Sequence, residues 1–379
     1  MKRMMAAMLA VLCSFILLGR NGVLAAEEPE IAAAAYVLME AETGTVLLES
    51  GADTQLSCGM MAKLMTALLT AEQLESGRWT LETELTANEA VSGIKGAVIW
   101  LVPGETMTVG DLLKGLIIGN ANDAAVALAV GVSGDTESFV MDMNARAFDL
   151  GMHNTRFNSP QGNHEEGQYT TARDLALLCA ALSRYDVLTP YFQTWRDFLR
   201  GEATELVNEN VLARTDDTSI GFKACHTETD GWSIAAGAER QHMKCIAVVL
   251  GCQTDDDRFA LAKLLLRRGF AGWKVVQPGF SAEFLYPVKV RGGVDQAVLV
   301  EPGELQGLVV PKSCSELETV LVLPRYVEAP VRRGQKLGDA AFYQGDTLLF
   351  ETTVVAAESV RARNFWDALQ KITVKMLKL

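Results

Sequence analysis

The sequence predicts an α+β protein: a first domain in which strands from both ends enclose a helical middle, then a small all-β domain and one amphipathic helix. Two pairs of β-rich runs, within residues 36–49 and 232–250, each flank a turn and lie on either side of several helical runs. After Pro278 the pattern changes to short β-rich runs separated by Gly and Pro, as far as about Val355. The chain has 379 residues, and single cores stop growing near about 250–300 residues, so two cores are expected.

Each helix of the first domain has its own signal. Residues 60–69 are apolar nearly all round, which predicts a buried central helix. Thr108 stands three residues before Asp111, and Thr171 three before Asp174, a spacing typical of a capped helix start. Further helices are expected at 123–130 and 256–269.

The N-terminus has the features of a secretory leader. Lys2 and Arg3 precede an apolar run that ends in small residues at 23–25, which predicts a signal peptide cut near Ala25. An uncleaved membrane anchor is the alternative, but the run is short and Arg20 interrupts it. The body of the protein is therefore expected outside the cytoplasm, at the outer face of the cytoplasmic membrane. The expected organisation is a signal peptide at 1–25, a first domain at 26–275, a β domain at 276–360 and an amphipathic helix at 361–379.

Composition excludes some functions. The formal charge is −13, and without the three basic residues of the leader 31 basic residues face 47 acidic ones, a net of −16. Such a surface does not suit nucleic acid. The seven cysteines show no metal-ligand spacing, so buried thiols are expected rather than disulfides, and neither a metal nor a cofactor is predicted.

The last residues form one apolar stripe on a basic helix. Residues 361–379 carry five basic residues against Asp367, a net of +4 on an acidic protein. This pattern predicts adsorption of 364–379 to an anionic membrane surface, whereas packing on the β domain is the alternative. The stripe consists of Phe365, Leu369, Ile372, Met376 and Leu379.

Three islands in the first domain carry residues suited to chemistry. Residues 59–66 place Met60 three positions before Lys63. Residues 115–129 contain Asn120 and Asn122. The third island, 221–227, contains Lys223, Ala224, Cys225, His226 and Thr227.

By order and spacing, these islands resemble the S-x-x-K, S-x-N and K-T-G motifs of penicillin-binding proteins and class A β-lactamases. In that resemblance Met60 occupies the place of the nucleophilic serine and Asn120 that of the second serine. Ala224 and Cys225 replace the threonine and glycine of the third motif. Connecting stretches such as 157–162 match as well.

The second domain distinguishes the possible relatives, because a class A β-lactamase would lack it. The sequence therefore resembles the serine-type D-Ala-D-Ala carboxypeptidases. The resemblance implies a β-lactamase/transpeptidase-like fold, an antiparallel sheet with a helical cluster, and a role in peptidoglycan metabolism.

The substitutions bear directly on catalysis. Acyl transfer of this kind needs a hydroxyl one helical turn before a lysine, so that the amine can take the hydroxyl proton. Met60 offers a thioether, which has no proton to lose. Asn120 can hydrogen-bond but cannot relay a proton, Ala224 has lost a hydroxyl, and Cys225 adds bulk. We therefore expect a catalytically inactive homologue that binds stem peptide or a protein partner of the cell envelope.

The remaining groups are binding groups. Lys63, Lys223 and Arg258 would form a cationic pocket beside Asn122 and His226, and the resemblance aligns Arg258 with a carboxylate-binding arginine. For each group, retention for structural reasons is the alternative. The expected ligand is peptidoglycan stem peptide or a β-lactam-like molecule, with binding weak or lost. By the resemblance, the substrate-binding positions are Ala224, Cys225, His226, Thr227 and Arg258.

Two other functions stay open. The chain could be an active D-alanyl-D-alanine carboxypeptidase that uses an unforeseen nucleophile, for which Cys225 is the candidate. Alternatively, the β domain and the terminal helix could be the functional part, as a scaffold at the membrane surface.

Overall fold

A computed structural model describes residues 32–162, 167–229, 231–280, 285–314, 317–367, 369 and 373. The chain divides into two units, Met1–Ala32 and Ala33–Leu379. The expected signal peptide at 1–25 lies outside the described residues, as does most of the expected helix at 364–379.

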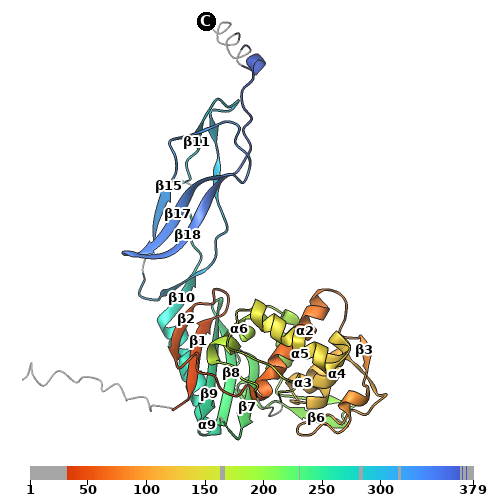
Figure 1. The fold of residues 1–379 in the computed structure, drawn as a ribbon. Helices are drawn as coiled ribbons and strands as arrows, with labels where there is room; N and C mark the ends of the chain where they lie inside the picture. Colours follow the sequence, from red (N-terminus) through yellow and green to blue (C-terminus); the bar gives the residue numbers. More distant parts are fainter. Residues whose placement is uncertain are drawn as a thin grey trace, which may run out of the picture. The chain divides into compact units, whose positions relative to one another are not determined.

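An antiparallel five-stranded sheet organises the first part of the larger unit (Figure 1). Its strand order is β2-β1-β9-β8-β7, so strands from both ends of the first domain meet in it. This arrangement confirms the predicted α+β class and both predicted strand pairs. The bounds are β1 Ala35–Glu40, β2 Val46–Ser50, β7 Ser219–Thr227, β8 Gly231–Arg240 and β9 Met243–Cys252.

Helices fill the sequence between these strands, as predicted. Both predicted caps are present, since Thr108 Oγ1 accepts from the N–H of Asp111 and Thr171 Oγ1 from that of Asp174, each at 3.1 Å. The α-helices are α2 Ala62–Glu75, α3 Val109–Ile117, α4 Asn122–Ser133, α5 Thr136–Asp149, α6 Ala172–Leu182, α7 Thr189–Gln193, α8 Leu212–Thr215 and α9 Asp255–Gly272. Short 3₁₀ turns are η1 Gly59–Met61, η2 Glu89–Val91 and η3 Asp186–Leu188, and two small hairpins pair β3 Glu84–Thr86 with β4 Thr106–Thr108 and β5 Arg196–Leu199 with β6 Thr204–Val207.

The two faces of the five-stranded sheet are covered by different helices. Val37 and Met39 of β1 belong to the core that the helical middle builds. The intervening Leu38 faces α9, because a Cβ at Gly269 would lie 3.0 Å from its side chain. Helix α2 passes through the helical core and is buried on nearly every side, as its sequence predicts.

The described residues after α9 form strands only, as far as residue 364, which confirms a separate all-β C-terminal region. It has hydrophobic clusters of its own, one around Val298 and Val354 and one around Val310 and Phe342. The domain boundary expected at residue 276 falls at the last residue of β10 and stays a prediction. The strands are β10 Trp273–Val276, β11 Val288–Arg291, β12 Ala297–Val298, β13 Val300–Pro302, β14 Leu308–Pro311, β15 Glu318–Val322, β16 Tyr326–Glu328, β17 Lys336–Gln344 and β18 Thr347–Ala356.

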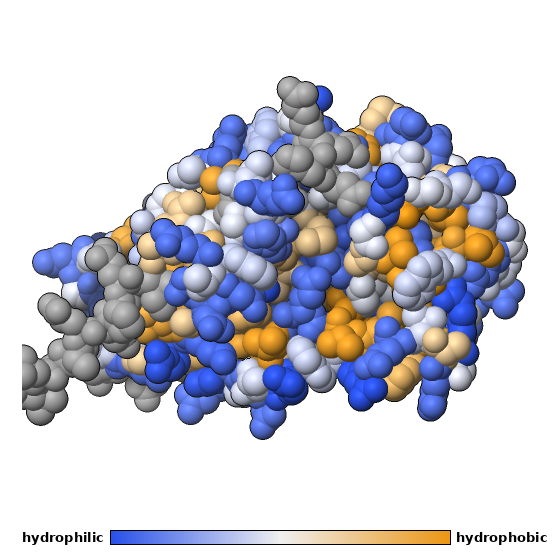
Figure 2. All heavy atoms as spheres, turned by 90° about the horizontal axis from the view of Figure 1, so that it is seen from below, coloured by the Kyte–Doolittle hydropathy of each residue, from blue (hydrophilic) through white to orange (hydrophobic). Residues whose placement is uncertain are grey.

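The cysteines, the helix lengths and the hydropathy of the surface describe how the protein meets its surroundings. In the described part of the chain all six cysteines are buried thiols, as predicted. No single described helix could cross a membrane by length and apolarity, and α4 and α5 meet that test only as a pair bent by 83°. Hydrophilic side chains cover most of the face in Figure 2, with hydrophobic residues in small groups between them.

Candidate active site

Met60 lies in the 3₁₀ turn η1, directly before α2 and three residues before Lys63. The stretch 157–162 supports this turn from the side. Thr66 Oγ1 donates to the carbonyl of Pro160 at 2.7 Å, and a Cβ at Gly162 would come within 2.0 Å of the Gly59 carbonyl oxygen. Only glycine fits at 162, so one of the connecting stretches fixes the backbone beside Met60.

Asn120 reaches Met60 from the turn between α3 and α4. Its backbone is left-handed at φ 53°, a conformation that asparagine tolerates better than most residues. Its Nδ2 donates to Met60 Sδ at 3.1 Å and to Glu209 Oε1 at 3.0 Å. Met60 and Asn120 are therefore in direct contact, and Asn120 also binds the carboxylate of Glu209.

Glu209 was not among the predicted site residues. It lies in the stretch 206–210, which matches the resemblance in the sequence, but its own position there gave no chemical signal. The structure shows it through the bond to Asn120 and through its electrostatic influence on Lys63 and Lys223.

Lys63 is 2% exposed, and its Nζ has no hydrogen-bond partner among the described residues. Burial, followed by the charge of Lys223, holds the pKa of Lys63 well below its usual range, against the opposing influence of Glu209. Burial also lowers the pKa of Lys223. A cavity of about 10 Å³ borders both lysines, which is room for one water molecule.

Asn122 and Asp123 begin α4 and hold the loop before it. Asn122 Nδ2 donates to the carbonyl of Lys95 at 2.6 Å. The buried carboxylate of Asp123 accepts from the N–H groups of Ile99 and Leu101, at 3.0 and 2.9 Å. These bonds fix the backbone on both sides of Trp100.

Trp100 stands between the two bonded amides. Its backbone is left-handed at φ 57°, and the residue is 72% exposed. Arg200 Nη1 donates to the carbonyl of Ile99 at 2.8 Å, which adds a third restraint. An unfavourable backbone conformation for a non-glycine residue is thus held in place by its surroundings.

Strand β7 supplies the third motif. Gly221 and Phe222 both have positive φ, and a Cβ at Gly221 would lie 2.4 Å from that of Phe192, so the strand begins with an irregular turn that needs glycine. Lys223 and Cys225 then lie two residues apart on one face. Burial raises the pKa of the Cys225 thiol to about 11, although Lys223 acts in the opposite direction.

Arg258 lies in α9, where its guanidinium is 3% exposed and bound to the sheet. Its Nη1 donates to the carbonyls of Cys225 and Ser233, at 2.7 and 3.0 Å. Its Nη2 pairs with Asp255 at 2.5 Å, and its Nε has no partner in the described residues. The guanidinium therefore holds β7 against β8, and its buried Nε–H has no hydrogen-bond acceptor among the described residues.

The remaining residues of the third island differ in exposure to solvent. His226 is exposed and stacks on Trp232, with ring centroids 4.3 Å apart. Thr227 lies beside η1, since a Cβ at Gly59 would be 2.7 Å from its Cγ2. Ala224 is 1% exposed. No group of three or more His, Cys, Asp or Glu in the described chain has a metal-binding arrangement.

The family assignment follows from comparison with known proteins. The profile of a family described as D-alanyl-D-alanine carboxypeptidase, Peptidase S11, matches residues 23–254. The chain belongs to the D-alanyl-D-alanine carboxypeptidase family. It is 31% identical over 340 residues to D-alanyl-D-alanine carboxypeptidase DacF of Bacillus subtilis, covering 88% of this chain and 87% of that protein.

Solved structures agree with the assignment to the carboxypeptidase family. Penicillin-binding protein 5 from Haemophilus influenzae superposes with a TM-score of 0.79 at 25% identity, over 88% of this chain and 99% of that one. Penicillin-binding protein D2 from Listeria monocytogenes, solved with ampicillin bound, gives 0.58 at 26% identity and covers 64% of this chain and 99% of its own. The transpeptidase-like fold expected from the resemblance is confirmed.

Proposed function

We propose that this chain is a catalytically inactive carboxypeptidase homologue that binds the stem peptide of peptidoglycan, outside the cytoplasm, without cleaving it. The observation that carries the proposal is the pair Met60 and Asn120. A thioether stands three residues before Lys63, and the amide of Asn120 is bonded to its sulfur at 3.1 Å. Neither side chain can form an acyl bond or transfer a hydroxyl proton.

The rest of the site supports binding over turnover. Burial lowers the pKa of both Lys63 and Lys223, which suits these amines to accept a proton. However, no hydroxyl lies one helical turn before Lys63 to supply that proton. Cys225 is a poor replacement nucleophile, because at a pKa of about 11 the thiol is protonated near neutral pH. The alternative of an active enzyme acting through Cys225 is thereby weakened.

The test compares the chain without residues 1–25 with Met60→Ser and, as the matched control, Met60→Ala. In the serine variant the hydroxyl proton would pass by way of Lys63 to the lactam nitrogen, as an ester forms and the lactam C–N bond breaks. We expect a fluorescent penicillin to label Met60→Ser covalently, and to label neither the natural chain nor Met60→Ala. Labelling of the natural chain, followed by mass spectrometry of the adduct, would refute inactivity.

Binding is tested separately from labelling. A stem-peptide mimic ending in D-Ala-D-Ala should bind the natural chain in calorimetry, and one ending in L-Ala-L-Ala should not. Lys223→Gln should weaken that binding about tenfold, since it removes a charge-assisted hydrogen bond. If millimolar D-Ala-D-Ala mimic gives no signal, the chain does not bind stem peptide.

Attachment to an anionic membrane through 364–379 is part of the proposal. Phe365 and Trp366, at the start of this segment, are 72% and 71% exposed, which favours a membrane over the β domain as their partner. Asn364 and Asp367 cap the helix start reciprocally, each at 2.9 Å. The double variant Phe365→Ala, Trp366→Ala should reduce sedimentation with phosphatidylglycerol vesicles, and unchanged sedimentation would exclude this role.

A further inference from the structure

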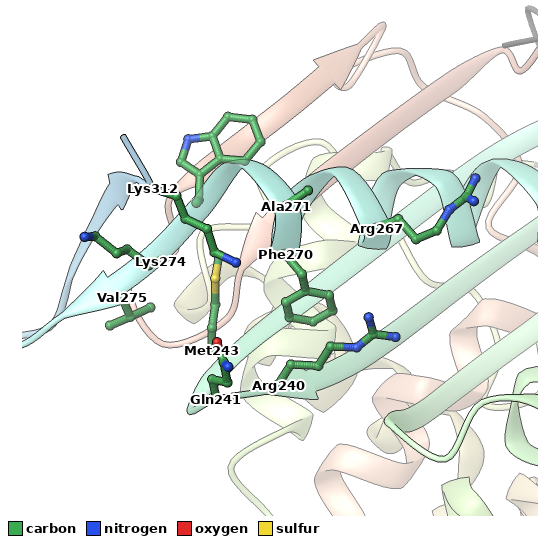
Figure 3. Close-up of a pocket in the computed structure, with 10 residues that line it drawn as sticks. Arg240, Gln241, Met243, Arg267, Phe270, Ala271, Lys274, Val275 and Lys312 are labelled. Carbon is green, nitrogen blue, oxygen red and sulfur yellow. The ribbon is translucent and has the colours of Figure 1, made fainter. Parts of the chain in front are cut away.

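A second cationic site lies at the end of α9, away from the three motifs in sequence. It is a pocket of about 560 Å³ bordered by α9, the β8–β9 turn, β10 and the residue that follows β14 (Figure 3). A volume of this size suits a small ligand. We call it the α9 pocket; its charged and aromatic lining residues are Arg240, Arg267, Phe270, Trp273, Lys274 and Lys312.

Every charged residue that lines the α9 pocket is cationic, although the chain as a whole carries −13. Arg267 and Lys312 are exposed and have no ion pair among the described residues. Their charges are therefore not neutralised by a described carboxylate. Two unneutralised cations on an otherwise acidic protein favour an anionic ligand.

The other two cations are held in position. Arg240 lies 4.9 Å from the ring centroid of Phe270, and its Nη2 is 3.7 Å from Asp216. Lys274 Nζ donates to the carbonyl of Cys314 at 2.8 Å, so it keeps its charge at a fixed position. Arg240 and Lys274 are thus held by described partners, whereas Arg267 and Lys312 are exposed and outside any described ion pair.

The walls of the pocket are fixed by backbone contacts. The N–H of Lys312 donates to the carbonyl of Gly272 at 2.8 Å, which ties the end of β14 to the end of α9. The tight β8–β9 turn holds Gln241 and His242 at φ 51° and 62°. Phe270 and Trp273 add an apolar surface, so the site suits an anion that carries an organic group.

We propose that the α9 pocket binds a phosphate-bearing organic ligand. Arg267 and Lys312, the two lining cations outside any described ion pair, match a group of two negative charges, and the guanidinium fork suits phosphate oxygens. Phosphate of this kind occurs in free phosphate esters, in phosphodiester polymers and in lipid headgroups. The site does not depend on the inactivity of the carboxypeptidase centre or on stem-peptide binding.

The experiment uses the chain without residues 1–25 and inorganic pyrophosphate as the probe, measured by calorimetry at low salt. Arg267→Gln and Lys312→Gln should each weaken binding about tenfold, because each removes a charge-assisted contact. Arg325→Gln, an exposed cation of the all-β region outside the pocket, is the control for net charge and should leave binding unchanged. Raising the salt concentration should weaken binding further.

Three further probes separate the sources of phosphate. Glycerol phosphate tests a free ester, a poly(glycerol phosphate) chain tests a polymer, and phosphatidylglycerol vesicles compared with phosphatidylcholine test a lipid. For the vesicles, the terminal helix is unchanged in all variants, so only a difference between Arg267→Gln and Arg325→Gln supports the pocket. The proposal is overturned if millimolar pyrophosphate does not bind, if Arg325→Gln weakens binding as much, or if a glutamate-rich peptide binds more tightly than every phosphate.

Discussion

The active-site lysines and the cations of the α9 pocket show how environment decides what a basic side chain can do. Lys63 is 2% exposed and without a described hydrogen-bond partner, and burial lowers its pKa strongly. Arg267 and Lys312 are exposed. The lowered pKa suits the buried amine of Lys63 to accept a proton, whereas the exposed cations suit binding of an anion by charge.

The active site and the α9 pocket also differ in their relation to the family motifs. Around Met60 and Lys63 the supporting framework of the motifs is present, such as Gly162 packed against Gly59. The α9 pocket shows no trace of the three motifs. Ligand chemistry can therefore lie in a part of the molecule that the family motifs do not indicate.

The largest loss of stability is expected at Asp123, whose buried carboxylate has hydrogen-bond partners, whereas the buried amine of Lys63 has none among the described residues. Asp123→Ala should lower the free energy of unfolding by about 3 kcal/mol, since it leaves the buried amides of Ile99 and Leu101 without an acceptor. Urea unfolding checks this, with the exposed Asp149→Ala as control. Equal losses in the two variants would show that the carboxylate of Asp123 does not hold the loop.

The thiol of Cys225 tests whether neighbouring cations can activate a buried group. With a pKa of about 11, it should react with a thiol reagent at pH 8 more than ~100-fold slower than an exposed cysteine. Labelling of Cys225 is measured as the difference between the natural chain and Cys225→Ala. This difference should develop slowly in the folded chain and rapidly in urea, which exposes the thiol. Fast labelling in the folded chain would reopen Cys225 as a nucleophile.

Replacement of the unpartnered amine should stabilise the fold. Lys63→Met should raise the free energy of unfolding at pH 7 by about 1–3 kcal/mol, because it removes a buried polar atom that has no described hydrogen-bond partner. The exposed Lys289→Met is the control and should change little.

The pH dependence of the same variant has a definite sign. The pKa of Lys63 is lower in the folded than in the unfolded chain, so the folded state binds fewer protons at any pH between the folded value and its ordinary value near 10.5. The natural chain should therefore gain stability as pH rises from 7 toward 10, and Lys63→Met should gain less. Parallel pH curves would show that Lys63 is not desolvated.

The smallest effect is expected in the α9 pocket. Arg267→Gln and Lys312→Gln should change the free energy of unfolding by less than about 0.5 kcal/mol, because both side chains are exposed and outside any described ion pair. A larger loss would mean that these cations support the fold, and any loss of phosphate binding would then need another explanation.

The sequence predicted the elements that depend on local signals. The caps at Thr108 and Thr171 and the wholly apolar α2 could be identified from spacing and period. Contacts between distant segments could not be predicted this way. The bond of Asn120 to Glu209 joins positions 89 residues apart, and Glu209 alone has the appearance of an ordinary surface acid.

Arg258 illustrates the same limit for a residue that was identified. Its position in the resemblance suggested a ligand contact, but its Nη1 donates to the carbonyls of Cys225 and Ser233, and these bonds depend on how α9 packs against the sheet. The α9 pocket was missed entirely, because its cations come from four separate segments and form no motif.

The loop around Trp100 has a consequence for spectroscopy. Its indole is 72% exposed, while Asp123 and Arg200 fix the backbone on both sides. Such an indole should emit at the long wavelength of a hydrated ring. In a variant whose other five tryptophans are replaced by phenylalanine, the emission of Trp100 would report on the loop that leads into α4.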